Sequence, residues 1–296
     1  MRLYLFVLIG VLSVASSAIF VKLANAESGA IAFYRMLFSV LLMLPLFLVK
    51  HRHEIKHIKR NDYVIMALSG IFLAFHFILW FESLNYTSVA SSTVLVTLQP
   101  LFTIVGTYLL FKEAITRKTI IAATITIIGS VLIGWGDFKV GGTALWGDFL
   151  ALAACALISF YMLCGQSARK NVSATTYTLL VYFVSAVTLA IYMIVKGEKF
   201  GPYASIDWFW FLLLAIVPNL LGHNLFNWAL QYISANVISI AILFEPVGAS
   251  LLAFFIFSEV LRGSQIVGGV IVIVGIIFYT LDEKKIKKYF KKTIDE

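Results

Sequence analysis

Charged residues are scarce in this chain, and that scarcity excludes the commonest class of protein. Asp, Glu, Lys and Arg make up 13% of its 296 residues, whereas soluble domains carry about 25%. Hydrophobic residues make up 61%, and the mean hydropathy is +0.95. We therefore expect an integral membrane protein. Because the apolar runs are unbroken rather than alternating with polar residues, helices and not the strands of a barrel are predicted to cross the bilayer.

Cysteines and catalytic motifs are nearly absent as well. The two cysteines, Cys155 and Cys164, fall in one predicted helix, too far apart to form a disulfide, and two lone thiols do not hold a metal. The chain has no Walker sequence, no spaced cluster of metal ligands and no nucleophile motif. We expect neither an enzyme nor a cofactor or metal site, and we expect that ATP does not power the protein directly.

Ten apolar runs are long enough to cross a bilayer. The first run also has the composition of a signal peptide with a cleavage site near Ala18, but its apolar sequence continues beyond that residue, so we interpret it as a span. The connections are short and leave no room for a soluble domain. The expected spans are 3–23, 29–49, 63–83, 88–111, 118–135, 146–164, 174–195, 206–229, 236–257 and 264–281.

Lys and Arg are distributed unevenly among the connections. With the amino terminus inside, 17 of them fall in inside segments and 4 in outside loops. Because an excess of Lys and Arg marks cytoplasmic segments, we expect a protein of the cell membrane with both termini cytoplasmic. The basic tail, residues 284–296, is expected to lie near anionic lipid and not to bind nucleic acid.

The second half of the sequence repeats the first at an offset of 146 residues. The offset carries Pro100 to Pro246, for example, and needs no gap over nearly a whole half. Each unit holds five spans, an odd number, so the second unit must enter the membrane from the opposite side. We therefore predict an all-α fold with two inverted five-helix repeats, 1–137 and 138–283, followed by the cytoplasmic tail. Inverted repeats are typical of alternating-access transporters.

Several motifs resemble one membrane-protein family. They are LNYTSVASSTVLVTLQPLF followed by LFKEAITRK, their second copies LQYISANVISIAILFEPVG and FSEVLRGSQ, and the stretches AFYRMLF and GDFLALAACALISFYML. Together they resemble the drug/metabolite transporter superfamily and, within it, the ten-helix EamA-type permeases, over essentially the whole chain. The resemblance implies transport of small organic metabolites by export, with amino acids and related compounds among them. It names no substrate, because the shared motifs are largely architectural.

One carboxyl group stands in the middle of an apolar span. Glu245 precedes Pro246, whereas Gln99 precedes the matching Pro100, so Glu245 is not part of the shared architecture. A charge at the centre of a membrane helix costs roughly 2.5–3.5 kcal/mol on insertion scales. We interpret Glu245 as a group that binds the cationic part of a substrate or carries a coupled proton; a neutral, hydrogen-bonded structural role is the alternative. The two prolines are predicted to be hinges or merely to shape their helices.

Two further spans carry polar stripes. Ser69, His76 and Ser83 recur every seven residues, with Trp80 one turn from His76. Asn219, His223, Asn227 and Gln231 recur every four residues in another span. Polar stripes on membrane helices face the bundle interior or a wet cavity. We predict a central cavity; the candidate substrate-binding or proton-coupling residues are Glu245, His76, Trp80, His223, Asn227 and Gln99.

Three charges fall near the predicted outer ends of their helices. Lys22, Arg35 and Glu82 either reach the interface, as long Lys and Arg side chains do, or form an outer gate in which Glu82 pairs with one of the two cations. Small residues in the fifth and tenth spans are expected to serve close helix packing. They are Ala122, Gly129, Gly268 and Gly275.

The sequence leaves several functional alternatives open. A metabolite exporter is favoured; the other candidates are an organic cation or drug efflux transporter, which the single midplane carboxylate would suit, and a membrane protein with a purely structural role. The expected partners are a small-molecule substrate, the lipid bilayer and, for a coupled transporter, protons. The protein is expected to be a monomer or a homodimer.

Overall fold

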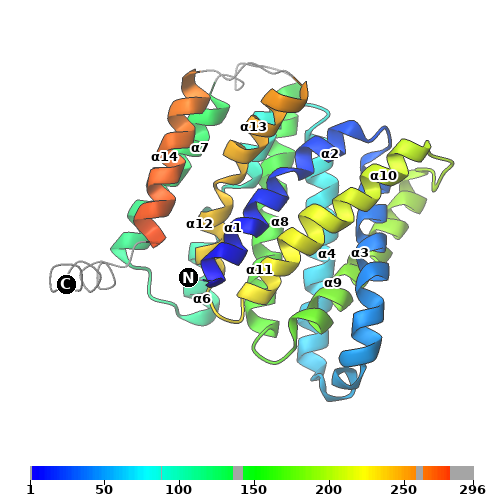
Figure 1. The fold of residues 1–296 in the computed structure, drawn as a ribbon. Coiled ribbons are helices and arrows are strands. Elements are labelled where there is room, and N and C mark those ends of the chain that lie inside the picture. Colours follow the sequence, from blue (N-terminus) through cyan, green and yellow to red (C-terminus); the bar gives the residue numbers. More distant parts are fainter. Residues whose placement is uncertain (1, 88, 136–142, 258–262, 281–296) are drawn as a thin grey trace, which may run out of the picture.

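The computed structural model describes residues 2–87, 89–135, 143–257 and 263–280, and all regular structure in these ranges is helical. The elements, which Figure 1 shows as a ribbon, are α1 (Arg2–Ala15), α2 (Ser17–Leu23), α3 (Ser28–Lys50), η1 (Arg52–His57), α4 (Arg60–Ser83), α5 (Val89–Val96), α6 (Pro100–Phe111), α7 (Arg117–Gly134), α8 (Thr143–Ala168), α9 (Ala174–Lys196), α10 (Ser205–Leu214), η2 (Ala215–His223), α11 (Asn224–Ala229), α12 (Ala235–Ile242), α13 (Glu245–Phe257) and α14 (Gly263–Thr280).

Eight segments of the described chain are long and apolar enough to cross a membrane. Several consist of more than one element: α1 with α2, α5 with α6, α10 through η2 to α11, and α12 with α13. They match eight of the expected spans. The fifth and tenth expected spans correspond to α7 and α14, each 18 residues long, and their crossing of the membrane stays a prediction.

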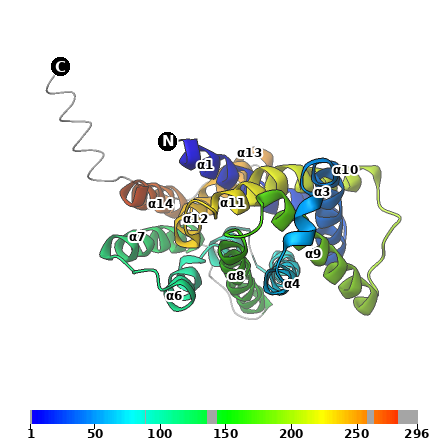
Figure 2. The same cartoon turned by 90° about the horizontal axis from the view of Figure 1, so that it is seen from below.

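The helices form a bundle with an elongated cross-section. Seen end on in Figure 2, α7 and α14 lie at one end of the bundle, and α3, α9 and α10 lie at the other. In Figure 1, α1 begins and α14 ends at the lower end of the bundle, where η1 also joins α3 to α4. The central helices α1, α4, α8 and α12 therefore lie between two peripheral groups.

Two spans are interrupted in their middle, each at the expected proline. Residues 97–99 separate α5 from α6, which begins at Pro100, and residues 243–244 separate α12 from α13, whose second residue is Pro246. Proline lacks the N–H that would continue the helical ladder, and its ring crowds the preceding turn. The sequence predicted that the two prolines are hinges or merely shape their helices; the structure breaks both helices, and their action as hinges stays a prediction.

The span that contains Pro218 is widened rather than broken. Ala215–His223 forms the π-helix η2, and the amide of Asn224 donates to the carbonyl of Asn219, five residues earlier. A proline removes one ordinary helical hydrogen bond, which the wider turn accommodates. π segments are rare and are frequent at functional sites. This one carries Asn219 and His223, two members of the predicted polar stripe.

Glycines bring the backbones of α7 and α14 together. A Cβ atom added at Gly129 would lie 2.7 Å from the carbonyl oxygen of Gly268, and one at Gly275 would lie 3.1 Å from the amide nitrogen of Thr126. Because neither site has room for a larger side chain, the packing role expected for these glycines is confirmed. Ala122 is likewise fully buried. The pairing also shows that the two helices run in opposite directions.

The helix bounds themselves recur with the offset seen in the sequence. Adding 146 to the bounds of α3, α5 and α7 gives 174–196, 235–242 and 263–280, which are the bounds of α9, α12 and α14. In addition, α6 packs against α12 and α5 packs against α13. The two interrupted spans therefore lie side by side, in opposite directions, with their breaks close to each other.

Candidate functional site

Arg35 on α3 is fully buried and is held by three other elements. Its Nε donates to Oδ1 of Asn219 at 2.6 Å, and its Nη1 donates to Oγ of Ser17 at 2.8 Å. Its Cζ lies 4.1 Å from the centroid of the Phe77 ring, the geometry of a cation–π interaction. The guanidinium is thus fixed between α2, α4 and η2 in the interior of the bundle.

Glu245 shares this interior and interacts electrostatically with Arg35. Its side chain is 4% exposed. In the described part of the chain no ion pair within 4.0 Å joins the two residues, and no group donates a hydrogen bond to the Glu245 carboxyl. A buried guanidinium and a buried carboxyl group therefore share this interior without direct contact.

His76 and Trp80 line the neighbouring face of α4. The Nδ1 atom of His76 lies 3.0 Å from the carbonyl oxygen of Ala154 on α8; because a carbonyl only accepts, Nδ1 is the nitrogen that donates. The His76 ring stacks on Trp80 with centroids 5.9 Å apart. Both side chains are buried. The stripe predicted on this span therefore faces the bundle interior.

His223 and Asn227 come from η2 and α11, on the opposite side of the same interior. The His223 ring makes edge-to-face contacts with the Phe77 and Tyr161 rings, with ring centroids 5.9 and 6.4 Å apart. Asn227 is fully engaged, since Tyr161 donates to its Oδ1 at 2.8 Å and its Nδ2 donates to Oγ1 of Thr178 at 3.1 Å. These contacts give Asn227 a clear structural role.

Gln99 and Glu245 occupy equivalent places in the two interrupted spans. Gln99 is the residue immediately before α6, and Glu245 is the first residue of α13. The amino-terminal end of a helix carries a partial positive charge, which favours an anionic group there. The asymmetry found in the sequence thus puts a carboxyl group at one helix start and a neutral amide at the other.

Four buried polar atoms of this interior have no hydrogen-bond partner. They belong to four side chains that are at most 5% exposed. Leaving such a group unpaired costs about 1–3 kcal/mol, and most buried polar groups are paired. A buried polar atom without a partner can mark a place where a polar ligand or water completes the bonding, and four of the nine such atoms in the described part of the chain belong to residues named above. The atoms are Nη2 of Arg35, Nε1 of Trp80, Oε1 of Gln99 and Nδ1 of His223.

The three charges predicted at the outer ends are not brought together. Glu82 is half-buried and accepts from Oγ of Ser28 at 3.1 Å, while Lys22 is exposed. Within the described ranges no ion pair joins Glu82 to Lys22 or Arg35, and the gate stays a prediction. The expectation that Arg35 reaches the interface is wrong, because its side chain turns inward to the hydrogen-bond acceptors of α2 and η2.

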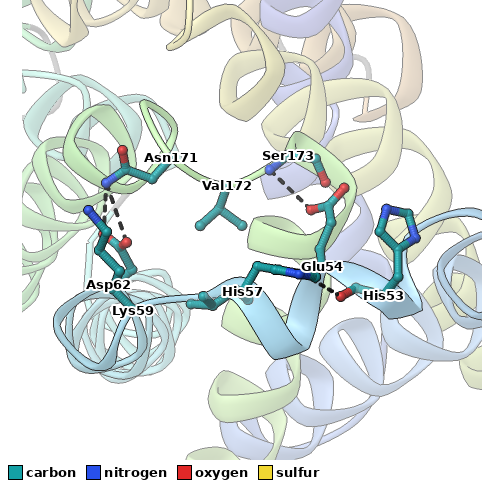
Figure 3. A pocket seen from close by; sticks show the side chains of 9 residues that line it. His53, Glu54, His57, Lys59, Asp62, Asn171, Val172 and Ser173 are labelled. Atoms are coloured by element: carbon teal, nitrogen blue, oxygen red, sulfur yellow. Dashed lines mark hydrogen bonds between the residues drawn. The ribbon is translucent and has the colours of Figure 1, made fainter.

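While the central cavity expected from the sequence stays a prediction, a cavity does lie at the lower end of the bundle. It has a volume of about 490 Å³ and opens between η1 and the connection from α8 to α9. As Figure 3 shows, Asn171 bonds to Asp62 on one side of the cavity and the amide of Ser173 bonds to Glu54 on the other. Its lining includes His53, Glu54, His57, Lys59, Asp62, Asn171 and Ser173.

Glu54 ties η1 to the start of α9. Its carboxylate accepts from Oγ1 of Thr176 at 2.7 Å, from the amide of Ser173 at 3.3 Å and from Nδ1 of His51 at 2.7 Å. Burial raises the pKa of Glu54, but hydrogen bonds from Ser173, His51 and Thr176 outweigh it and hold the pKa at about 2. These bonds link the α3–α4 hairpin to the amino-terminal end of α9.

Sequence reasoning missed two features of the interior. Arg35 was expected near the outer end of its helix, reaching the interface or forming part of a gate, because it lies only seven residues after the start of that helix. The second feature is the contact of the Phe77 and Tyr161 rings with His223. The sequence did not predict it, because nothing in the spacing of the aromatic residues distinguishes these two from ordinary apolar packing residues. A signal for Arg35 did exist: Asn219, its acceptor, belongs to the predicted polar stripe.

Comparison with known proteins identifies the family. A sequence model described as the EamA-like transporter family matches residues 1–135 and 145–281. An uncharacterized transporter of Archaeoglobus fulgidus is 23% identical over 263 residues, covering 88% of this chain and 89% of that protein. The pseudopaline exporter of Pseudomonas aeruginosa is 24% identical over 265 residues, with the same coverage of 88% and 89%.

A crystal structure of another protein, 16% identical in sequence, superposes with a TM-score of 0.77 over 94% of this chain and 96% of that one, which shows a shared fold. The names of the family and of these relatives are those of transporters and not of enzymes. Because the family match extends over most of its length, this chain belongs to the EamA-like transporter family and is a multi-pass membrane protein.

Proposed function

We propose that this chain is a secondary transporter that exports small organic metabolites, amino acids or related compounds among them, by alternating access. The observation that carries the proposal is the pair of spans interrupted side by side, together with buried polar atoms that have no partner among the described residues. Interrupted helices at the meeting of two halves are where transporters of this kind bind their substrates. The name of one relative, an exporter of pseudopaline, supports the direction of transport.

The proposed architecture has ten spans in two inverted five-helix repeats, 1–137 and 138–283, in the cell membrane with both termini cytoplasmic. Support comes from the offset of 146 in the helix bounds, the opposed packing of the interrupted spans and the two separate segments that match the family. The start of α1 and the end of α14 lie at one end of the bundle (Figure 1). The predicted tail, 284–296, lies outside the described residues.

In the proposed mechanism, Glu245 acts where the two halves meet. It binds the cationic part of the substrate, or it holds a proton while the site faces one side and releases it on the other. His76 and His223 are proposed to share such a proton, since both side chains are buried in the same interior as Glu245. The interruptions at Pro100 and Pro246 are the proposed hinges, since few backbone hydrogen bonds resist bending there.

A second candidate within transport is efflux of organic cations, which the single midplane carboxyl group favours. Against a purely structural role stand the unpaired polar atoms, since a membrane scaffold gains nothing from leaving them unsatisfied. Whether the working unit is a monomer or a homodimer does not change the proposed site, because every residue of the site comes from one chain.

Reconstitution into vesicles tests the proposal. The purified protein is inserted into liposomes loaded with pools of amino acids, amines and other small metabolites, and release is followed with and without a pH gradient. We expect protein-dependent flux of at least one pool, and gradient dependence would identify proton coupling. Absence of flux from every pool, with the protein shown to be folded and inserted, would overturn the proposal.

A further inference from the structure

The guanidinium of Arg35 is oriented by the protein and yet only partly used by it. Nε and Nη1 are bonded to Asn219 and Ser17, and one face of the group covers the Phe77 ring. Nη2 is buried and has no partner. Because two nitrogens and one face are fixed, the third nitrogen points in one direction only. A guanidinium that is fixed in this way, with one N–H group unbonded, is oriented to donate a hydrogen bond to an acceptor on a bound molecule.

Trp80 supplies a second donor of the same kind. Its indole is 2% exposed, and its Nε1 is buried without a partner. Trp80 follows Phe77 by less than one turn of α4, and both rings pack against Phe81, at 5.4 and 5.5 Å. The Arg35 Cζ lies 5.8 Å from that same Phe81 ring. The two unused donors therefore border one aromatic cluster.

Both unused groups can only donate, and this determines the chemistry of their partner. A guanidinium and an indole N–H have no acceptor atoms, so neither can bind an ammonium group or another cation. A carboxylate is planar and has two acceptor oxygens, which suits an arginine better than any other side chain. Glu245, the nearby carboxylate of the protein, is not within ion-pair distance of Arg35.

We propose that Arg35 and Trp80 form a subsite for the carboxylate of a zwitterionic substrate, whose ammonium group faces Glu245. The inference rests on the proposed function and narrows it, because it selects amino acids and amino-acid-like compounds over simple amines. The substrate enters the interval between the two buried opposite charges and pairs with both. Its side chain then lies among the aromatic rings of Phe77, Tyr161 and His223.

The test compares solutes that differ in one charged group. Thermal stabilisation of the purified full-length protein is measured for leucine and phenylalanine, for the amines formed by their decarboxylation and for the acids formed by their deamination; the same solutes are then assayed for flux in vesicles. We expect at least one amino acid to stabilise the protein at concentrations tenfold or more below those its amine and its acid require. That difference corresponds to the loss of one charge-assisted hydrogen-bonding partner, roughly tenfold or more.

Variants assign the effect to the subsite. Trp80→Phe removes the unused N–H together with part of the indole but keeps an aromatic ring, and Arg35→Lys keeps the charge but loses the planar fork. Each is expected to weaken amino-acid binding several-fold and to leave amine binding unchanged. Ser130→Ala on α7 is the matched control, because its hydroxyl is also buried and unpaired but lies on a peripheral helix; it should change neither.

The outcomes separate this inference from the proposed function. If amines are bound or transported as well as amino acids, or if Trp80→Phe weakens both classes equally, the carboxylate subsite is wrong while transport stands. If other solutes are transported and no amino acid binds, the subsite is wrong as well. If no solute moves at all, the proposed function fails together with the subsite. Should Arg35→Lys not fold, Trp80→Phe alone decides.

Discussion

Arg35 donates through Nε to Oδ1 of Asn219 at 2.6 Å, and this bond joins a helix of the first half to the π segment of the second. Asn219 in turn donates to Oγ of Ser39 at 2.9 Å. The amide of Asn219 therefore bridges two positions on α3 that are one turn apart. A widened helical turn and a buried cation thus depend on each other.

Asn219→Ala is expected to destabilise the protein. The substitution leaves the buried Arg35 Nε without its acceptor, at an expected loss of about 1.5–3 kcal/mol in the free energy of unfolding. Thermal unfolding in detergent measures the change. Asn85→Ala is the control, because Asn85 is exposed and its contact with Glu82 is long, at 3.4 Å. Equal melting temperatures for the two variants would contradict the structural role given to Asn219.

The contact between α7 and α14 predicts a second loss of stability. Gly129→Ala places a methyl group against the carbonyl of Gly268, and forcing extra volume into a packed contact typically costs 1–3 kcal/mol. Gly263→Ala is the matched control, because nothing lies within 4 Å of a Cβ atom at that position. Thermal unfolding of both variants checks the prediction, and a fully stable Gly129→Ala would show that the two helices separate readily.

Much of the fold was predictable because the bilayer restricts it. Only helices satisfy the backbone in hydrocarbon outside a closed barrel, so the length of the apolar runs located the spans. The offset of 146 anticipated helix bounds as well as residues. The complete interruption of the two helices was not predicted, because hydropathy does not show whether a proline bends a helix or ends it. Pro100 and Pro246 were identified, but their effect depends on the tertiary packing of α5, α6, α12 and α13.

The candidate site was predictable to a lesser degree. Depth along a helix follows from position, which is why Glu245, His76 and His223 were identified as interior groups. The direction of a long side chain does not follow from position. Arg35 was expected at the interface, yet an acceptor on another helix, Asn219, draws it inward. Partners that lie far apart in the chain decide such cases, and their pairing is visible only in the folded structure.

Glu54 predicts a dependence of stability on pH. Its pKa is held at about 2 in the folded protein by hydrogen bonds from Ser173, His51 and Thr176, against the effect of burial. Because the unfolded chain binds the proton more readily, this stabilisation is present above the usual glutamate value and is lost as the pH falls toward 2. The melting temperature of the wild-type protein should fall over this pH window. Glu54→Gln should have a lower melting temperature at neutral pH, and acidification should change it less. Parallel curves for the two proteins would exclude the effect.

The paired interruptions predict how the protein changes state. Pro100→Ala or Pro246→Ala supplies an N–H to the preceding turn and should allow the helix to continue, which slows exchange between inward-open and outward-open forms. Distances between spin labels report the change, with outer pairs at Tyr86 and Phe200 and inner pairs at Ile55 and Ile115, all exposed. Pro45→Ala is the control, because Pro45 lies inside α3 without interrupting it. Unchanged populations and exchange rates in both test variants would reduce the two prolines to a role in shape.

Glu245→Gln tests the role of the carboxyl group at the start of α13. Glutamine keeps the size and the neutral hydrogen-bonding capacity of the side chain but carries neither a charge nor an exchangeable carboxyl proton. If Glu245 binds the cationic part of the substrate or carries a coupled proton, flux in vesicles should fall at least tenfold, about the effect of one lost charge-assisted contact. Any dependence of flux on the pH gradient should disappear with it.

Expression and melting temperature of Glu245→Gln should persist, because no hydrogen bond from the described residues depends on this carboxyl group. Glu113→Gln is the matched control: Glu113 accepts from Nε2 of Gln166 after the end of α6, and a glutamine oxygen can accept the same bond. Normal flux with unchanged pH dependence in Glu245→Gln would leave the residue a structural role only. The unpaired donors of Arg35 and Trp80 would then have to bind a substrate whose ammonium group Glu245 does not bind.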